Sequence, residues 1–115
     1  MICKVHDLVG KWALTYEQGQ QVYDLIQPEL AQGRPVTLDF DGVKSVGALF
    51  WNRAVGDLLE DFTPDGLKRL LQVANIYPGG ERDFETVIDM SHQYYTNPRI
   101  REAVDRMMRS WAEEE

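Results

Sequence analysis

The chain has 115 residues, of which 43% are hydrophobic and 27% charged, and its formal net charge is −7. This length and composition fit one folded domain with a single core and argue against a globally disordered chain. The acidic balance disfavours binding to nucleic acid or to anionic membranes, so we expect neither as a partner. We expect a cytoplasmic protein, because the sequence has no membrane-spanning apolar run, no secretory signal and a single cysteine, Cys3.

The first third of the chain predicts a strand and a helix. Residues 2–9 alternate loosely between apolar and polar side chains, as an outer strand does. Thr15 and Gln18 have the spacing of a capping box, and apolar residues then recur at helical spacing. Gly33 ends this helix, and Pro28 inside it is expected to kink or shorten it.

The middle of the chain predicts a central strand followed by an apolar helix. Residues 35–40 (PVTLDF) are short, alternately apolar and bounded by turn residues, which is typical of a buried strand. Asp41 and Gly42 turn the chain, and residues 43–47 form a short bridge. Residues 48–62 then predict a helix whose apolar face is so broad that it must be buried on more than one side.

The last part of the chain predicts one more strand and further helices. Thr63 and Pro64 begin a short helical turn, and residues 70–76 (LLQVANI) form another buried strand. A helix around residues 84–95 turns one face inward, and a last helix begins at Asn97–Pro98.

The resulting order, β, α, β, α, β, α, α, favours an α/β domain with helices packed on a small sheet. We assign residues 1–97 to this domain. Residues 98–115, the last helix with its acidic tail, are expected to pack on the domain or to extend it.

Two aspartates at the end of the central strand are the strongest candidates for catalysis. The segment VTLDFDGV resembles the first motif of the haloacid-dehalogenase-like phosphatases. The resemblance implies that the Asp39 carboxylate attacks phosphorus while Asp41 handles the leaving-group proton, with Mg²⁺ neutralising the phosphate. The later strand, however, ends in Asn75 and Tyr77, so the acidic pair that completes such a metal site is missing. We therefore favour carboxylates that stabilise the turn, and we expect no catalytic residue, metal or cofactor. The phosphatase remains the alternative.

The element order and the segment after the first helix resemble the STAS fold of anti-sigma-factor antagonists, and above all the STAS-like proteins of unknown function. An apolar strand ending in LDF-x-GV, a small-residue loop and a helix with Phe and Leu carry the resemblance: Leu38, Asp39, Phe40, Gly42, Val43, Ser45, Val46, Gly47 and Phe50. It covers about residues 2–95. It implies a STAS-like sheet of about three to four strands with helices packed on it, to which the C-terminal amphipathic helix is an addition.

The same resemblance bears on regulation. In the phosphorylatable antagonists, a serine at the start of the helix after the central strand is modified by a partner ATPase kinase. Gly47, Ala48 and Leu49 stand at that place here, and none can accept a phosphate. Ser45 is the nearest hydroxyl and is interpreted as an ordinary loop serine. The resemblance thus implies a docking or regulatory module without this phosphorylation.

We predict a non-enzymatic protein-interaction module of a bacterial-type regulatory system, whose partner is an ATPase of the kinase type or another regulator. The predicted partner-binding residues belong to the loop after the central strand and to the next helix: Asp41, Gly42, Ser45, Gly47, Trp51, Asn52 and Arg53. Trp51 also has the size of a core residue, so burial is the competing expectation for it.

The last helix offers a second candidate surface. Its apolar residues recur on one stripe: Ile100, Val104, Met107, Met108 and Trp111. Such a stripe either covers the sheet or forms an interface, since Met and Trp suit adaptable contacts. Met107, Met108 and Trp111 are therefore the candidate interface for a homo-oligomer, which makes a self-associating structural module the third functional alternative.

Overall fold

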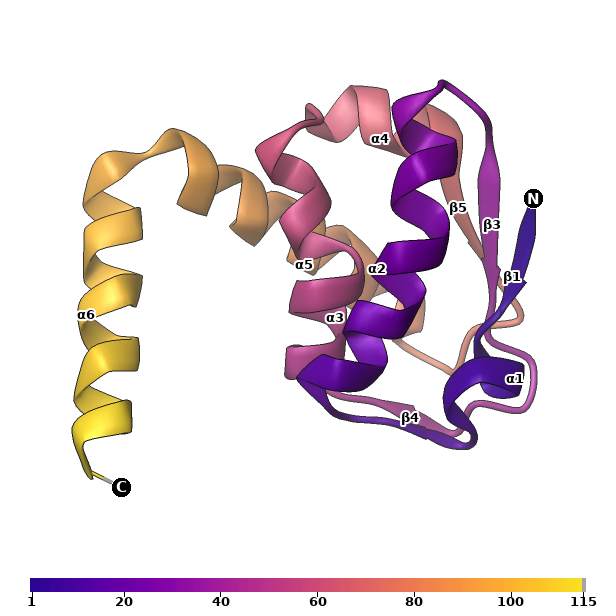
Figure 1. Ribbon diagram of the computed structural model, residues 1–115, viewed down its shortest axis with the longest axis horizontal. Coiled ribbons are helices and arrows are strands. Elements are labelled where there is room, and N and C mark those ends of the chain that lie inside the picture. The colour runs from indigo at the N-terminus through magenta and orange to yellow at the C-terminus, as the bar shows by residue number, and fades with distance from the viewer. Residues whose placement is uncertain (115) are drawn as a thin grey trace.

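Figure 1 shows a computed structural model of the chain, in which helices pack against a small parallel sheet and one helix, α6, stands apart. The structure describes residues 1–114, with side chains through Ser110. Within this range the elements in chain order are β1 (Ile2–Lys4), α1 (Val5–Val9), β2 (Trp12–Ala13), α2 (Tyr16–Ala31), β3 (Val36–Asp39), β4 (Ser45–Val46), α3 (Ala48–Ala54), the 3₁₀ helix η1 (Gly56–Glu60), α4 (Pro64–Leu70), β5 (Leu71–Ala74), α5 (Gly80–Thr96) and α6 (Pro98–Glu114). The α/β class predicted from the sequence is confirmed.

The main sheet has the strand order β1-β3-β5, and all neighbours in it are parallel. The register places Cys3 of β1 and Val73 of β5 on either side of Leu38. Val36 and Leu38 of β3 are buried, as a central strand covered by helices requires. The predicted strands over residues 35–40 and 70–76 are therefore both confirmed.

The first segment differs from its prediction. Only Ile2–Lys4 form a strand, and α1 begins at Val5. The helical turn carries Val5 into the core, where it is fully buried, and lays His6 against Gly42, whose added Cβ would lie 3.0 Å from the imidazole Cδ2. A loose alternation over eight residues fits this arrangement as well as a strand, so the prediction of one strand over residues 2–9 is wrong.

A second, two-stranded sheet was not expected. Strands β2 and β4 pair in parallel, with Trp12 opposite Ser45 and Ala13 opposite Val46. The Gly47 amide extends the pairing by donating to the Ala13 carbonyl at 2.8 Å. The predicted bridge, residues 43–47, is therefore hydrogen-bonded to the segment that leads into α2.

Helix α2 begins and packs as its sequence requires. The predicted capping box is present, because Thr15 Oγ1 accepts from the Gln18 amide at 3.1 Å and Gln18 Oε1 accepts from the Thr15 amide at 3.0 Å. Pro28 does not shorten the helix, which continues to Ala31. The helix lies against α3, and the contact is close at Gly19, where an added Cβ would lie 2.8 Å from the carbonyl oxygen of Phe50.

The apolar helix predicted over residues 48–62 is in fact two helices. Helix α3 ends at Ala54, and the chain continues as the 3₁₀ helix η1 from Gly56. An added Cβ at Gly56 would lie 2.6 Å from Ser91 Oγ, so the chain passes directly against α5 at this point. The change of helix type lets Leu58 and Leu59 both be buried, which explains why one continuous helix is the wrong prediction.

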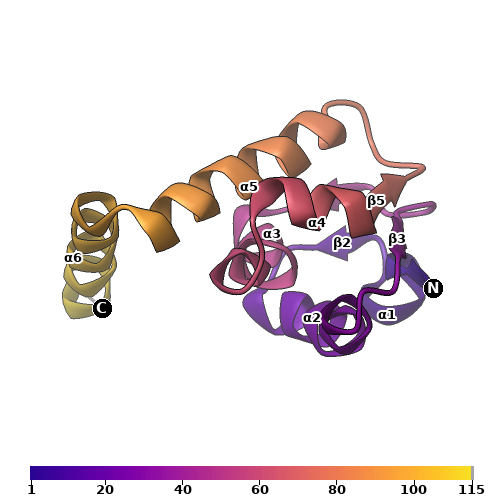
Figure 2. The same ribbon diagram turned by 90° about the horizontal axis from the view of Figure 1, so that it is seen from above.

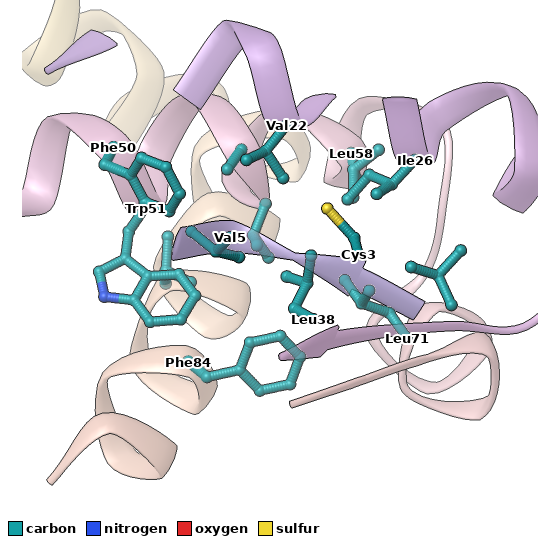
Figure 3. Packing of buried hydrophobic residues seen from close by; sticks show 14 of the residues in the cluster. Cys3, Val5, Val22, Ile26, Leu38, Phe50, Trp51, Leu58, Leu71 and Phe84 are labelled. Atoms are coloured by element: carbon teal, nitrogen blue, oxygen red, sulfur yellow. The ribbon is translucent and has the colours of Figure 1, made fainter. Parts of the chain in front are cut away.

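The core lies between the sheet and the helices. Figure 3 shows Trp51 beside Phe50 and close to Phe84, and the ring centroid of Trp51 is 6.0 Å from that of Phe84 and 5.4 Å from that of Phe40. The largest fully buried side chains come from every layer of the domain: Phe40, Phe50, Ile26, Leu30, Leu38, Leu58, Leu67, Leu71, Ile88, Val5, Val22 and Val36.

The two last helices extend away from the sheet. Helix α5 turns Phe84, Val87 and Ile88 into the core, as predicted. Helix α6 has α5 as its main neighbour, and both views show it projecting from the rest of the molecule, which we call the body, residues 1–97 (Figures 1 and 2). No helix within residues 1–114 is both long and apolar enough to cross a bilayer.

Candidate functional site

The aspartate turn lies at the carboxyl edge of the main sheet, where the ends of β3 and β5 meet. Asp39 Oδ1 accepts two hydrogen bonds, from the Asp41 amide at 2.9 Å and from Asn75 Nδ2 at 3.0 Å. Asn75 follows β5 with a positive φ of 52°, a conformation that Asn tolerates better than most residues. The side chain of Asp39 therefore ties the two strand ends together.

The same contacts favour the ionised form of Asp39. The hydrogen bond from the Asp41 amide, followed by that from Asn75, lowers the pKa of the Asp39 carboxyl. No group of three or more His, Cys, Asp or Glu side chains that could hold a metal ion occurs in the described part of the chain. At this pair the structure thus contains the turn-stabilising arrangement that the sequence favoured, with one oxygen of Asp39 already committed.

The loop after the turn is held in place along its length. Gly42 has a φ of 87°, the left-handed conformation that favours glycine, and Val43 is buried behind it. Ser45 is half-buried in β4, and Gly47 forms the N-cap of α3 without a side-chain hydrogen bond. Asp41 and Gly42 are exposed, so the start of this loop is the part that faces solvent.

One of the predicted partner-binding residues on α3, Trp51, is buried. Trp51 is 4% exposed, and its Nε1 donates to the Tyr77 hydroxyl at 3.1 Å. The competing expectation of a core tryptophan is the correct one. The large ring occupies the space between the sheet and α5, so its assignment to a docking surface is wrong.

Arg53 is half-buried and has several contacts within the chain. Its guanidinium donates to Gln20 and to Asp57, both at 2.7 Å, and lies 4.2 Å from the ring centroid of Tyr23. Asp57 also accepts from the Tyr95 hydroxyl at 3.0 Å. Arg53 thus connects α3 to α2 through Gln20 and to η1 and α5 through Asp57, and its contact with a partner stays a prediction.

Asn52 is exposed and belongs to a surface that sequence analysis did not find. Four large apolar side chains with 46–56% of their area exposed surround the start of α3: Trp12, Leu14, Tyr16 and Leu49. Leu14 is next to Gly47, since an added Cβ there would lie 3.4 Å from Leu14 Cα. Tyr16, Leu49 and Asn52 line one groove. We call these five residues the docking face.

Sequence analysis missed this surface because β2 has only two residues and gives no periodic signal. The segment WAL before a helix cap is apolar without being long enough to predict an element. Only the pairing of β2 with β4 brings Trp12 and Leu14 beside the α3 start.

The candidate interface on the last helix is exposed. Met107 and Met108 have 46% and 50% of their area exposed. The predicted contribution of Trp111 concerns a side chain that lies outside the described part of the structure.

Comparisons with known proteins agree with this architecture. A family model described as a STAS-like domain of unknown function (DUF4325) matches residues 18–81, from the first turn of α2 to the first residues of α5. Searches of curated proteins and of solved structures gave no match. The matched region is more than half of the chain and contains the central strand, the aspartate turn and α3. The chain therefore belongs to the family of STAS-like domains of unknown function.

Proposed function

We propose that the chain is a non-catalytic protein-interaction module of a regulatory system, and that it binds its partner through the docking face. The observation that carries the proposal is the group of half-exposed apolar side chains around the start of α3. Exposed apolar side chains that gather in one region of a domain mark a contact site for another protein. The two aromatic residues, Trp12 and Tyr16, are of the types that contribute most to binding energy at such contacts.

The position of the docking face supports the proposal. It lies beside the loop that follows the central parallel strand, the region in which α/β folds place their binding residues. The face is also preformed, because β2 and β4 are paired and the capping box fixes the start of α2. A preformed face loses less conformational entropy on binding than a mobile loop does.

The chemistry at the aspartate turn supports a role without catalysis. Asp39 uses one oxygen to hold the ends of β3 and β5, which gives this carboxylate a structural role. The start of α3 carries no hydroxyl at Gly47, Ala48 or Leu49. Partner binding in this proposal is therefore independent of phosphorylation at that point. The STAS resemblance makes an ATPase of the kinase type, in a bacterial-type cytoplasm, the first partner to test.

The test uses two leucines of similar exposure on different faces. Leu14 on the docking face is 46% exposed, and Leu25 on α2 is 43% exposed beside β1. The full chain is used to capture proteins from host extract with and without ATP and Mg²⁺, and the purified kinase-type ATPase is then titrated calorimetrically. Leu14→Glu should weaken binding by at least about thirtyfold, as for an interface hot spot, while Leu25→Glu binds like the unmodified chain.

Two outcomes would contradict the proposal. One is equal partner binding by Leu14→Glu and Leu25→Glu, which would move the contact away from the docking face. The other is Mg²⁺-dependent hydrolysis of a phosphomonoester that Asp39→Asn abolishes in a folded protein, which would restore the phosphatase alternative.

A further inference from the structure

A groove of about 290 Å³ lies in the angle between α6 and the body, and nothing in the described part of the chain fills it. Its walls come from the body and from α6 itself, with Tyr16, Leu49 and Met90 on one side and Val104 and Met108 on the other. Met90 is 65% exposed, so the wall formed by α5 is open. The groove is thus bounded by apolar side chains that have no covering layer.

The angle that creates the groove is fixed by specific contacts. The Tyr94 hydroxyl of α5 donates to Asp105 Oδ1 of α6 at 2.7 Å, and the Arg101 guanidinium lies 5.5 Å from the centroid of the Tyr94 ring. Asn97 Oδ1 accepts from the Arg99 amide at 3.0 Å at the start of the helix. The projection of α6 is therefore a defined arrangement, and the groove exists before anything enters it.

Helix α6 has the dimensions and pattern of a segment that enters such a groove. Its 17 residues make a rod about 25 Å long. Its apolar stripe leaves Met107 and Met108 about half exposed. Amphipathic helices in proteins gain most of their stability by burying such a stripe against another element. Because α6 projects from its own body, the surface that would bury the stripe has to come from another molecule.

The chain itself supplies both surfaces, an uncovered stripe on α6 and an uncovered apolar groove, so a second copy is the molecule that covers both at once. Charge adds to this match at one end of the helix. Residues 98–110 carry four arginines against two acidic residues, whereas residues 1–97 carry eight basic and fourteen acidic residues. Glu113 and Glu114 at the end of α6 bring the whole helix to zero net charge, so only its arginine-rich part, residues 98–110, complements the acidic body.

We propose that the chain forms a two-fold dimer in which α6 of each copy lies in the groove of the other. A two-fold interface uses the same patch on both subunits, so both stripes and both grooves are covered together. Five side chains of the groove and of the α6 stripe are about half exposed: Tyr16, Leu49, Met90, Met107 and Met108. At roughly 200 Å² for a large side chain, they offer on the order of 500 Å² per copy and about 1,000 Å² per dimer, enough for a specific interface.

The experiment is sedimentation equilibrium of the full chain over a range of concentrations. We expect the mass to approach twice the monomer value of 13.3 kDa. Met108→Glu on the helix and Met90→Glu in the groove should each weaken the dimer by at least about a hundredfold, because each buries an unpaired charge. Ser110→Glu adds the same charge two positions from Met108 but about 200° around the helix, and it should leave the dimer intact.

Both test positions are exposed, so the variants are expected to fold, which circular dichroism checks. The proposal is overturned by a chain that stays monomeric at all concentrations. It is also overturned by a dimer that survives either Met108→Glu or Met90→Glu. Leu14 does not line the groove, so Leu14→Glu should dimerise normally. The dimer and the docking face can thus fail independently.

Discussion

The contact between α2 and α3 depends on the missing side chain of Gly19, and its replacement gives the sharpest test of the fold. In Gly19→Ala the added Cβ would lie 2.8 Å from the Phe50 carbonyl oxygen, 2.9 Å from Arg53 Cβ and 3.2 Å from the Ala54 amide nitrogen. Two of these atoms belong to the backbone of α3, and Gly19 is buried, so the two helices have to move apart.

The expected magnitude comes from two opposing terms. Replacing Gly by Ala inside a helix favours folding by about 1 kcal/mol when nothing else changes. Inserting a methyl group into a close-packed contact costs about 1–3 kcal/mol, and more when backbone has to shift. Because the clash at Gly19 is with backbone atoms, we expect a net loss of about 1–2 kcal/mol, which corresponds to a fall in Tm of roughly 5–10 °C for a domain of this size.

Urea denaturation of the full chain measures this loss, and an exposed position on the same helix supplies the control. The variants Gln21→Gly and Gln21→Ala differ only in the intrinsic preference for the helix, since Gln21 is exposed, and the Ala variant should be the more stable by about 1 kcal/mol. Gly19→Ala should shift stability in the opposite direction. If both comparisons favour alanine equally, α2 and α3 are not in the close contact described.

Three further predictions concern the corrected and confirmed residues. Arg53→Glu should lower the free energy of unfolding by about 2–3 kcal/mol, because it leaves Asp57 beside a like charge. Asn52→Glu, at the exposed neighbouring position, should change the free energy of unfolding by less than about 0.5 kcal/mol. Equal effects of the two substitutions would contradict the contacts described for Arg53. Because the pKa of Asp39 is lowered, its ionised form contributes stability that is complete at a pH above the ordinary pKa of 3.8 and is lost as the pH falls below that value. Acid unfolding of Asp39→Asn should lack this loss of stability, and a pH profile equal to that of the unmodified chain would refute the prediction. Burial, followed by the hydrogen bond to Asp83, raises the pKa of Tyr77 to about 12. The resulting stability is complete below pH 10 and declines toward pH 12, so urea midpoints of Tyr77→Phe should fall less over this range than those of the unmodified chain.

Elements with strong local signals could be predicted from the sequence. The capping box at Thr15 and Gln18 fixes the start of α2, and alternating apolar residues mark β3 and β5. These signals are local, because a capping box consists of hydrogen bonds to nearby amides and a strand is marked by the periodicity of its own side chains. The STAS-like architecture follows from them.

What could not be predicted depends on contacts between distant segments. The break between α3 and η1 follows from the closeness of Gly56 to Ser91, 35 residues later in the chain. Strands β2 and β4 are two residues each and exist only through their pairing.

The burial of Trp51 and the contacts of Arg53 could not be predicted for the same kind of reason. This helix is apolar on most sides, so its sequence does not say whether Trp51 or Asn52 faces solvent. The position of α5 decides this, since Phe84 packs against Trp51. Arginine usually lies on the surface, so the sequence of α3 does not indicate the contacts that the Arg53 guanidinium makes with the Tyr23 ring and the Asp57 carboxylate.

Tyr16, Leu49 and Asn52 belong both to the docking face and to the wall of the groove beside α6. One set of side chains cannot be covered by two molecules, so under the two proposals above a regulator and a second copy of the chain would compete for each domain. By mass action the apparent affinity for the regulator would then fall as the total concentration of the chain rises. Free binding sites would increase more slowly than the total concentration, because the remaining chains would be stored as dimers.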